Sequence, residues 1–186
     1  MPKPTSIEAY AIISADGMLA DANRHIPQSM QIEADQKFFH GALDDAAVVV
    51  HGRHSHEGGP RAAQRHRLVM TRSIPALGPD PRHPKSLLWN PKGATLEEAW
   101  AELGAPAGML AVIGGPEVYS HFLDVGYDAF HLSHAPRARL PGGCPVFPEI
   151  GPDRTADDVL ASHGLKPGPR KMLDESADVT LVTWRR

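Results

Sequence analysis

The segment Ile113–Tyr119, with the sequence IGGPEVY, marks the point where a buried strand ends and a helix begins. An apolar run, MLAVI at 109–113, leads into it, and Pro116 stands in the first helical turn, where proline is favoured. The two glycines have no Cβ, so a phosphate can approach the backbone, and the helix dipole and first-turn N–H groups attract an anion. The segment predicts either a phosphate site or a plain strand-to-helix turn. It is not the dinucleotide fingerprint, because the third glycine and the downstream acid are missing.

Strand and helix patterns alternate along the rest of the chain, which predicts an α/β fold with a mostly parallel central sheet and flanking helices. Helical spacing is clearest at 95–103, where Thr95 and Glu98 form a capping box. The predicted helices are 33–43, 95–103, 116–123 and 157–163. The predicted strands are 7–14, 46–50, 68–70, 109–113, 128–133 and 179–184, with 87–89 as a weaker candidate.

Length and composition narrow the class of protein. The 186 residues fit a single domain spanning 1–186, punctuated by 17 glycines and 18 prolines. Nineteen Lys and Arg against 22 Asp and Glu leave no surplus of cations for sequence-independent nucleic-acid binding. Cys144 is the one cysteine, which excludes an intramolecular disulfide. With no apolar run long enough for a membrane span, we expect a cytoplasmic protein whose partner is a small molecule, not nucleic acid or a membrane.

Two further strands end in residues suited to phosphate. The strand at 46–50 is followed by His51-Gly52-Arg53-His54-Ser55, and the strand at 68–70 by Thr71-Arg72-Ser73. Ligands of open α/β sheets bind beyond the carboxyl ends of strands, and guanidinium and hydroxyl groups suit a phosphate. Together with the segment at 113–119, these ends predict a phosphorylated, nucleotide-like ligand.

The histidines at 51, 54 and 56 could be mistaken for a metal site. Ligands must converge on a metal, whereas alternate residues of an extended segment point apart, and no acid or cysteine motif accompanies them. We therefore predict no metal site.

Several segments jointly resemble the dihydrofolate reductase family in order and approximate spacing. They are IEAYAIISADGMLA at 7–20, DQKFF at 35–39, GRHSHE at 52–57, IGGPEVYSHFL at 113–123 and FPEI at 147–150. A related group, the reductase half of the bifunctional riboflavin-biosynthesis deaminase/reductase, shares the fold. The resemblance implies the three-layer dihydrofolate-reductase-like fold, with NADPH as the hydride donor.

The resemblance also implies a substrate site. Asp35 matches the carboxyl that binds the amino-pyrimidine edge of a pterin and aids protonation; burial beside apolar side chains should raise its pKa. Ile12 and Phe39 would line the substrate ring, and Ser133 would support the carboxyl. Arg65 lies near the place of the arginine that grips the glutamate tail of folate. Glu33 is the competing carboxyl, which an alignment slip would exchange with Asp35.

On the cofactor side, the resemblance implies contacts from the first strand and from all three strand ends. The cofactor-binding residues so predicted are Ala11, Gly52, Arg53, His54, Ser55, Thr71, Arg72, Ser73, Ile113, Gly114, Gly115, Glu117, Val118 and Tyr119.

The chain departs from the family pattern at three places. The loop 18–30 lacks a tryptophan and is about three residues longer, and Pro116 stands where the closest pattern has a further glycine. The segment 57–59, expected to wall the substrate, is Glu-Gly-Gly and nearly without side chains. These departures weaken folate as the substrate more than NADPH as the cofactor.

The expected function is NADPH-dependent reduction of a pterin-type heterocycle, as in folate metabolism. One alternative is the reduction of a phosphoribosylaminouracil in riboflavin biosynthesis, for which Arg65 and Arg67 could supply a basic cluster. The other is a non-catalytic nucleotide-binding module that keeps the phosphate loops. The segment 179–184 is either a buried last strand or the edge of a homodimer, so the oligomeric state stays open.

Overall fold

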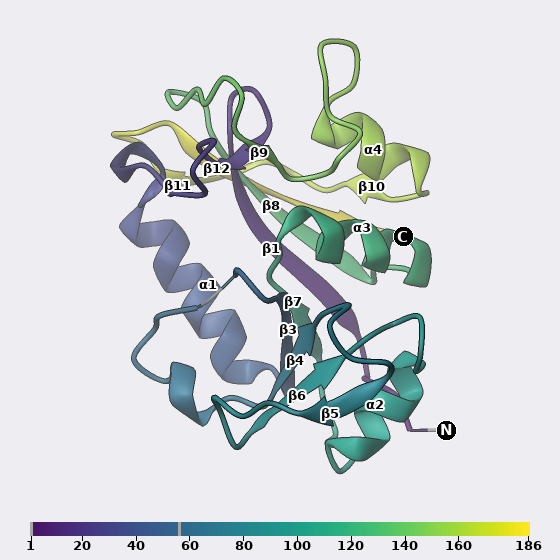
Figure 1. The fold of residues 1–186 in the computed structure, drawn as a ribbon. Coiled ribbons are helices and arrows are strands. Elements are labelled where there is room, and N and C mark those ends of the chain that lie inside the picture. Colours follow the sequence, from purple (N-terminus) through teal and green to yellow (C-terminus); the bar gives the residue numbers. More distant parts are fainter. Residues whose placement is uncertain (1, 56) are drawn as a thin grey trace.

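A mostly parallel sheet forms the centre of the computed structural model, which describes residues 2–55 and 57–186 (Figure 1). Its strands follow the order β10-β12-β8-β1-β7-β3-β4-β6-β5, and β11 pairs with β12 beside β10. These strands are β1 (Ile7–Ser14), β3 (Val48–Gly52), β4 (Arg67–Met70), β5 (Leu77–Pro79), β6 (Ser86–Trp89), β7 (Leu110–Val112), β8 (Ala129–Ala135), β10 (Lys166–Pro167), β11 (Lys171–Asp174) and β12 (Val179–Arg185). A separate two-stranded sheet pairs β2 (Met18–Ala20) with β9 (Cys144–Pro145).

The five central strands beside β8 are parallel to their neighbours, and the antiparallel pairs lie toward the edges. β8, β1, β7, β3, β4 and β6 run parallel, whereas β12 pairs antiparallel with β8, and β5 with β6. This arrangement confirms the predicted α/β class with a mostly parallel sheet.

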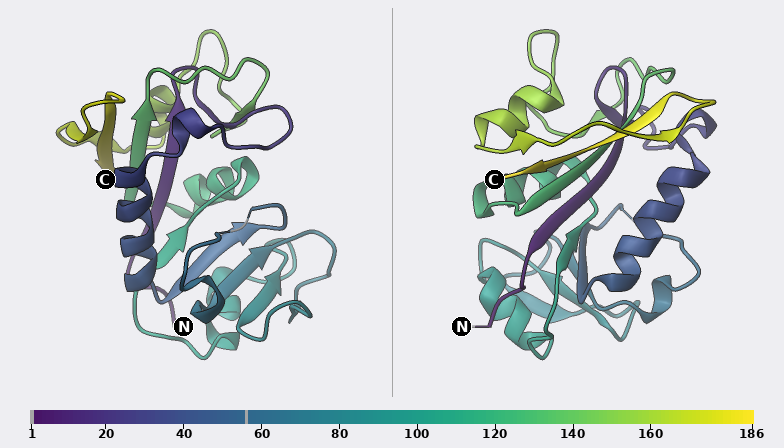
Figure 2. Two further views of the ribbon diagram at one scale, coloured as in Figure 1. Left: turned by 90° about the vertical axis from the view of Figure 1, so that its left-hand side faces the viewer. Right: turned by 180° about the vertical axis from the view of Figure 1, so that it is seen from behind.

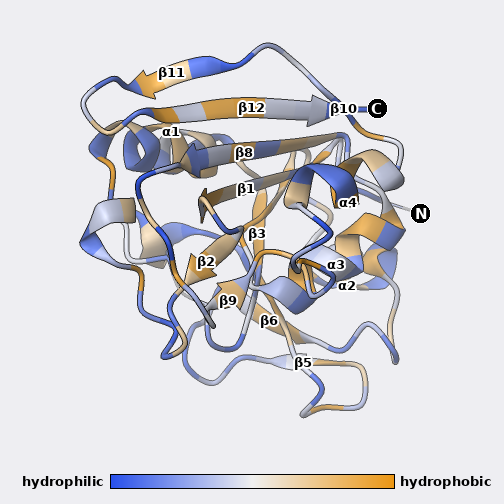
Figure 3. Ribbon diagram, turned by 90° about the horizontal axis from the view of Figure 1, so that it is seen from above, coloured by the Kyte–Doolittle hydropathy of each residue, from blue (hydrophilic) through white to orange (hydrophobic). Residues whose placement is uncertain are grey.

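The helices cover both faces of the sheet and make three layers (Figure 2). α1 (Glu33–Asp45) packs on one face; α2 (Leu96–Glu102), α3 (Pro116–Val125) and α4 (Ala156–Ser162) pack on the other. Successive side chains of β1 point to opposite faces of the sheet, as in any strand, and so pack in the two helical layers by turns. Ala9 and Ile13 join the core beneath α2, α3 and α4, whereas Tyr10 packs beneath α1. Figure 3 shows apolar residues on sheet strands such as β3 and β12, with more polar residues in the connecting loops.

Local sequence signals explain where the short helices begin. Thr95 caps α2 in a reciprocal box with Glu98, as the sequence predicts, and Thr155 caps α4 in the same way with Asp158. Both helices have only seven residues, so satisfying the free first-turn N–H groups matters more than in a long helix. No helix among the described residues is both long and apolar enough to cross a membrane.

The position of the last strand, β12, in the sheet is defined by its pairing. β12 pairs with β8 on one side and with β10 and β11 on the other, so it is a buried last strand and not an edge. The very short strands β2, β5, β9 and β10 and the strand β11 were not predicted.

Candidate functional site

The candidate site lies where two central strands separate. β1 pairs with β7 only from Ile7 to Ala9, but with β8 all the way to Ser14. Beyond Ala9 the backbone of β1 therefore has no strand partner on its β7 side. The Tyr119 hydroxyl of α3 donates a hydrogen bond of 2.6 Å to the Tyr10 carbonyl oxygen there. The connection after β1 leads through α1 to β3, and the connection after β7 leads through α3 to β8 on the opposite side. Open α/β sheets bind ligands where the connections of two neighbouring strands diverge in this way.

α1 brings a buried carboxyl to this place. Asp35 stands in the first turn of α1 and is 9% exposed, and Ser133 of β8 is 1% exposed. Burial raises the pKa of the Asp35 carboxyl, and a hydrogen bond from the Ser133 side chain offsets part of the rise. The charge of Asp35 in turn helps burial to raise the pKa of Tyr119, so both groups share one electrostatic environment. A carboxyl of raised pKa can exchange a proton nearer to neutral pH than a solvated acid can.

Burial distinguishes the two acids at the start of α1. Glu33 is exposed, whereas Asp35 is buried against the sheet. This difference favours Asp35 as the active carboxyl, although the role itself stays a prediction.

Two phenylalanines follow Asp35 by one helical turn and point in different directions. Phe38 lies over β1 and β8, with its ring 5.9 Å from that of Tyr10 and 5.8 Å from that of His131. The Phe39 ring lies 5.4 Å from that of His40, on the side of α1 nearer to the loop after β3. Both are half-buried, so either can offer an apolar surface next to Asp35. Ile12 packs on the same side of the sheet, against the cluster that contains Met30 and Ile32.

The turn between β7 and α3 needs glycine. Gly114 has φ +101°, and a Cβ there would lie 2.9 Å from the Tyr119 ring. The peptide bond between Gly114 and Gly115 is cis. Gly115 caps α3 without a side-chain hydrogen bond, and Pro116 follows in the first turn. The start of α3 thus presents backbone without side chains, which is the arrangement an anion needs at a helix N-terminus.

The loop after β3 contacts this turn directly. The Gly52 N–H donates to the Gly114 carbonyl (2.9 Å), and a Cβ on Gly52 would lie 3.5 Å from the Val118 side chain. A Cβ on Gly115 would lie 3.6 Å from the Ser55 hydroxyl. The structure therefore brings together two of the three strand ends that the sequence singled out.

The third strand end reaches α3 through an ion pair. Thr71 is buried, and its hydroxyl bonds to that of Ser73 (2.9 Å) and accepts from the Ser73 N–H. Arg72 extends outward, and its guanidinium donates to the Glu117 carboxylate over 3.4 Å. The side chains of this pair are 76% and 73% exposed.

Arg65, which the resemblance places near the tail of a substrate, is buried between two carboxylates, and its role toward a substrate stays a prediction. Its side chain is 7% exposed and pairs with Glu57 at 3.0 Å and with Asp44 of α1 at 2.9 Å. Arg67, 8% exposed, pairs with the same Glu57 at 2.7 Å. The expectation that 57–59 is nearly without side chains is corrected: the Glu57 side chain is 1% exposed and joins the loop to both arginines.

The remaining predicted site residues lie on different faces of the sheet or on the surface. Ala11 packs on the face of α2, α3 and α4, whereas Ile12 faces α1. Arg53 and His54 are exposed beside the Gly52 turn, and Ile113 packs toward α1. Their predicted contacts with a cofactor stay predictions.

Sequence reasoning missed the partners of Arg65. Glu57 looked like part of a loop, and Arg67 was considered only for a basic cluster. A usable signal was present, because positions 65 and 67 are alternate residues of an extended segment and so point to the same side. Two arginines facing one way inside a domain require a carboxylate partner, and Glu57 is the nearest acid in the sequence.

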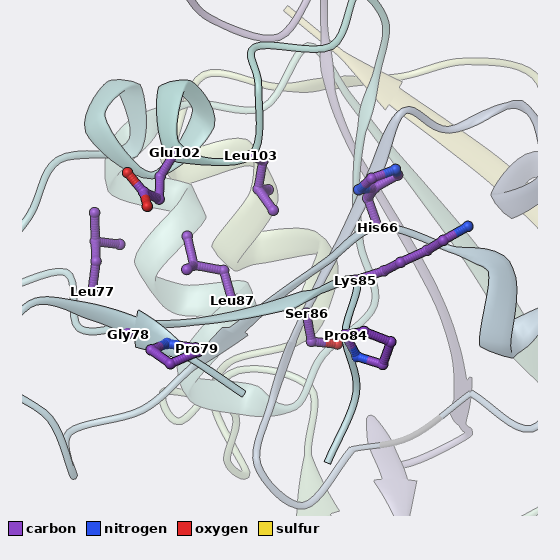
Figure 4. Close-up of a pocket in the computed structure, with 10 residues that line it drawn as sticks. All are labelled: His66, Leu77, Gly78, Pro79, Pro84, Lys85, Ser86, Leu87, Glu102 and Leu103. Atoms are coloured by element: carbon purple, nitrogen blue, oxygen red, sulfur yellow. The ribbon is translucent and has the colours of Figure 1, made fainter. Parts of the chain in front are cut away.

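A hollow of about 480 Å³ lies away from this site, between the β5–β6 pair and the end of α2 (Figure 4). The hollow lies at the N-terminal ends of β4 and β6, whereas Thr71 follows the C-terminal end of β4. None of the predicted site residues lines it. Its lining residues are His66, Leu77, Gly78, Pro79, Pro84, Lys85, Ser86, Leu87, Glu102 and Leu103.

Across residues 2–55 and 57–186, no group of three or more His, Cys, Asp or Glu is arranged to hold a metal ion. One of the three histidines considered above, His56, lies outside the described residues.

Comparisons with known proteins identify the fold. No protein-family profile and no curated protein matches the sequence. The solved structures that match the fold include three with a TM-score of 0.65. One is a riboflavin biosynthesis protein from Shewanella sp. PV-4, at 16% identity, covering 98% of this chain and 99% of that one.

The second is a diaminohydroxyphosphoribosylaminopyrimidine deaminase/5-amino-6-(5-phosphoribosylamino)uracil reductase from Thermotoga maritima, at 15% identity. The match covers 97% of this chain but 56% of that one, so this chain spans about half of the bifunctional protein. The third is the dihydrofolate reductase of Enterococcus faecalis complexed with NADP(H), at 17% identity, covering 97% and 96% of the two chains. The chain therefore has the dihydrofolate-reductase-like fold that the sequence predicted.

Proposed function

We propose that this protein is an NADPH-dependent reductase that transfers a hydride to a pterin-type heterocycle. The observation that carries the proposal is the buried carboxyl of Asp35, whose pKa is raised by burial, beside the place where β1 and β7 separate. An acid of raised pKa at the ligand-binding position of an α/β sheet is a strong indication of a functional site. The reductase-like fold of the solved neighbours supports the same reaction class.

The residues at the strand ends suit a dinucleotide. A Cβ on Gly114 would clash with Tyr119, so the turn is kept free of side chains at the start of α3, where a pyrophosphate would lie. Ser55 and Arg53 would bind phosphate oxygens, and Arg72 with Thr71 would bind a phosphate on the adenosine ribose. When bound, NADPH supplies the hydride. The neighbour from Enterococcus faecalis, complexed with NADP(H), supports this choice of cofactor.

Asp35 would perform two tasks toward the substrate. Its carboxylate oxygens would accept hydrogen bonds from the amino and ring N–H groups of an amino-pyrimidine edge, which fixes the orientation of the ring. Its raised pKa would also let it hold a proton closer to neutral pH than a solvated acid does, and release it to the ring that is being reduced. The apolar surfaces of Ile12 and of Phe38 or Phe39 would exclude water from the ring.

A second candidate is reduction of the phosphoribosylaminouracil of riboflavin biosynthesis. It is favoured by the two solved neighbours with riboflavin-pathway names, whose TM-scores equal that of the dihydrofolate reductase. Asp35 would have the same role with either ring, since both present N–H groups beside a ring nitrogen.

The test is the substitution Asp35→Asn, followed by the loss of NADPH absorbance with dihydropterins, dihydrofolate and the riboflavin-pathway pyrimidine in turn. We expect kcat to fall by about 10²–10⁴ because the proton donor is lost, with little change in the Kd for NADPH. Glu33→Gln, on the exposed side of the same helical turn, is the matched control and should keep wild-type kcat. NADPH binding without turnover of any of these substrates would instead indicate a nucleotide-binding module.

A further inference from the structure

The hollow between the β5–β6 pair and the end of α2 has the size of a ligand pocket. Its volume is about 480 Å³, within the range of about 300–1,000 Å³ that small-molecule sites span. It lies at the N-terminal ends of β4 and β6, whereas the strand ends considered for the cofactor are C-terminal. Nothing in the proposed reduction uses this hollow.

Apolar side chains form the middle of the hollow. Leu77, Leu87 and Leu103 line it, and each packs at the same time against the main core. All three are half-buried, so part of their apolar surface faces the hollow. An apolar group of a ligand would remove this surface from water, which is favourable.

The segment that joins β5 to β6 holds one wall of the hollow in a fixed shape. The Asp80 side chain is 4% exposed and accepts a hydrogen bond of 3.0 Å from the Arg82 N–H. The Ser86 N–H donates to the His83 carbonyl oxygen over 3.1 Å. Three prolines restrict the backbone between positions 79 and 84. A wall that is already ordered loses little conformational entropy when a ligand binds.

Groups of opposite charge lie at the two ends of the hollow (Figure 4). Glu102 lies at one end and His66 and Lys85 at the other, with Leu87 and Leu103 between them. Among residues 2–55 and 57–186, no ion pair or hydrogen bond involves the Glu102 carboxylate or the His66 ring. The Lys85 ammonium donates only to a neutral partner, the carbonyl oxygen of residue 64, over 3.3 Å. Both ends therefore keep a group that can bind an opposite charge.

We propose that the hollow binds an amphipathic zwitterion, with an amine and a carboxylate at opposite ends of an apolar body, of which a short apolar peptide is the simplest case. The amine would pair with Glu102, and the carboxylate would accept hydrogen bonds from Lys85 and His66. The apolar body would cover the leucines between them. An anion at both ends would be repelled by Glu102, and a cation at both ends by Lys85, so the charges select against both.

The experiment is an NMR titration of the isotope-labelled full chain with the dipeptide Leu-Leu, its N-acetylated form, its C-terminal amide and Gly-Gly. Leu-Leu should bind saturably with a Kd of about 1 mM or below, and the shifted amides should be those of 77–87 and 102–103. Blocking either terminus should weaken binding about two- to fivefold, the size typical of an exposed ion pair. Gly-Gly keeps both charges but lacks the apolar body, so it should bind at least about tenfold more weakly.

Variants of the protein test each end separately. Glu102→Gln should weaken the binding of Leu-Leu and leave that of the N-acetylated form unchanged, because that form has no amine. Lys85→Gln should weaken the binding of Leu-Leu and leave that of the amide unchanged. Both positions are exposed, so the fold should tolerate these substitutions. Glu97→Gln, in the first turn of the same helix and outside the hollow, is the matched control and should change none of the affinities.

Four results would overturn the proposal. They are the absence of saturable shifts with Leu-Leu up to about 10 mM, shifts confined to other parts of the chain, equal affinities for Leu-Leu and its blocked forms, and equal affinities for Leu-Leu and Gly-Gly. Equal effects of Glu102→Gln and Glu97→Gln would do the same. The titrations need neither NADPH nor a heterocycle, so their outcome is independent of the proposed reductase activity.

Discussion

Two sets of ion-paired side chains flank the candidate site, and they differ in burial. Arg65 and Arg67 are nearly enclosed with Glu57, whereas Arg72 and Glu117 meet on the surface with about three-quarters of each side chain exposed. The first set has short bonds and no water to replace them, so breaking it leaves an unpaired charge in the protein. The second has one long bond that water and salt can replace. In the sequence alone the two sets look alike, since each combines arginine with an acidic residue. Only the exposed set is free to exchange its carboxylate partner for a ligand.

The largest effect is expected from Glu57→Ala. This substitution leaves two buried guanidinium groups without their shared carboxylate, which should lower the free energy of unfolding by about 3–5 kcal/mol. Urea unfolding measures the change. Glu117→Gln, which removes the carboxylate of the exposed set, should change stability by less than about 0.5 kcal/mol. Similar losses for the two substitutions would contradict the distinction drawn between the two sets.

The pH dependence of the same variant provides an internal check. Hydrogen bonds and charge from Arg65 and Arg67 outweigh burial and lower the pKa of Glu57 below 4.5. The stabilisation is therefore fully present above pH 4.5 and is lost as the pH falls through the lowered folded-state pKa. The difference between wild type and Glu57→Ala should be constant near neutrality and narrow in acid. A difference that stays constant in acid would indicate lost packing instead of lost charge.

A smaller effect is expected from Arg72→Ala. If Arg72 exchanges Glu117 for a phosphate on the adenosine ribose, the substitution should weaken NADPH binding by about tenfold and leave NADH binding unchanged. Calorimetric titration with the two nucleotides measures both. Arg82→Ala is the control, because Arg82 is also exposed and also pairs over 3.4 Å, with Asp80. Equal weakening for NADPH and NADH would place Arg72 away from that phosphate.

The smallest effect is expected from Glu117→Gln, measured in the same titrations. Removing a competing carboxylate should strengthen NADPH binding by about two- to threefold, the size typical of an exposed pair, and the gain should fade at high salt. Weaker NADPH binding in this variant would mean that Glu117 contacts the cofactor favourably and does not compete for Arg72.

Local signals predicted most of the fold. Apolar runs ended by glycine or polar residues predicted the central strands, and the Thr95–Glu98 capping box marked the start of α2 within one residue. The short strands β2, β9 and β10 were not predictable in this way, because two or three residues show no periodicity. They exist because a partner strand distant in sequence lies beside them, as Met18 lies beside Pro145.

The features of the candidate site also fall into those that could be predicted from the sequence and those that could not. The glycines at 114 and 115 could be predicted, because a strand-to-helix turn has a local sequence pattern. Asp35 was singled out only by the resemblance to the dihydrofolate reductase family, and no local pattern distinguishes it from a solvated acid on a helix. The pairing of Arg65 with Glu57 had a local signal, but its contact with Asp44 could not be predicted, because Asp44 belongs to a helix 21 residues earlier. The separation of β1 from β7 beyond Ala9 likewise depends on pairing over a hundred residues along the chain. Predicting these features requires the order of the strands, not only their positions.

The central place of β1 affects how the chain folds as it is made. Ile7 pairs with Leu110, and Glu8 with Ala129, so neither neighbour of β1 exists when β1 leaves the ribosome. At synthesis rates of about 5–20 residues per second, the first strand waits roughly 5–25 seconds for its partners. During that time the apolar run at 7–14 has unpaired N–H and C=O groups on both sides and can pair with other chains. The same strand that forms one wall of the candidate site is therefore the segment most exposed to aggregation during synthesis.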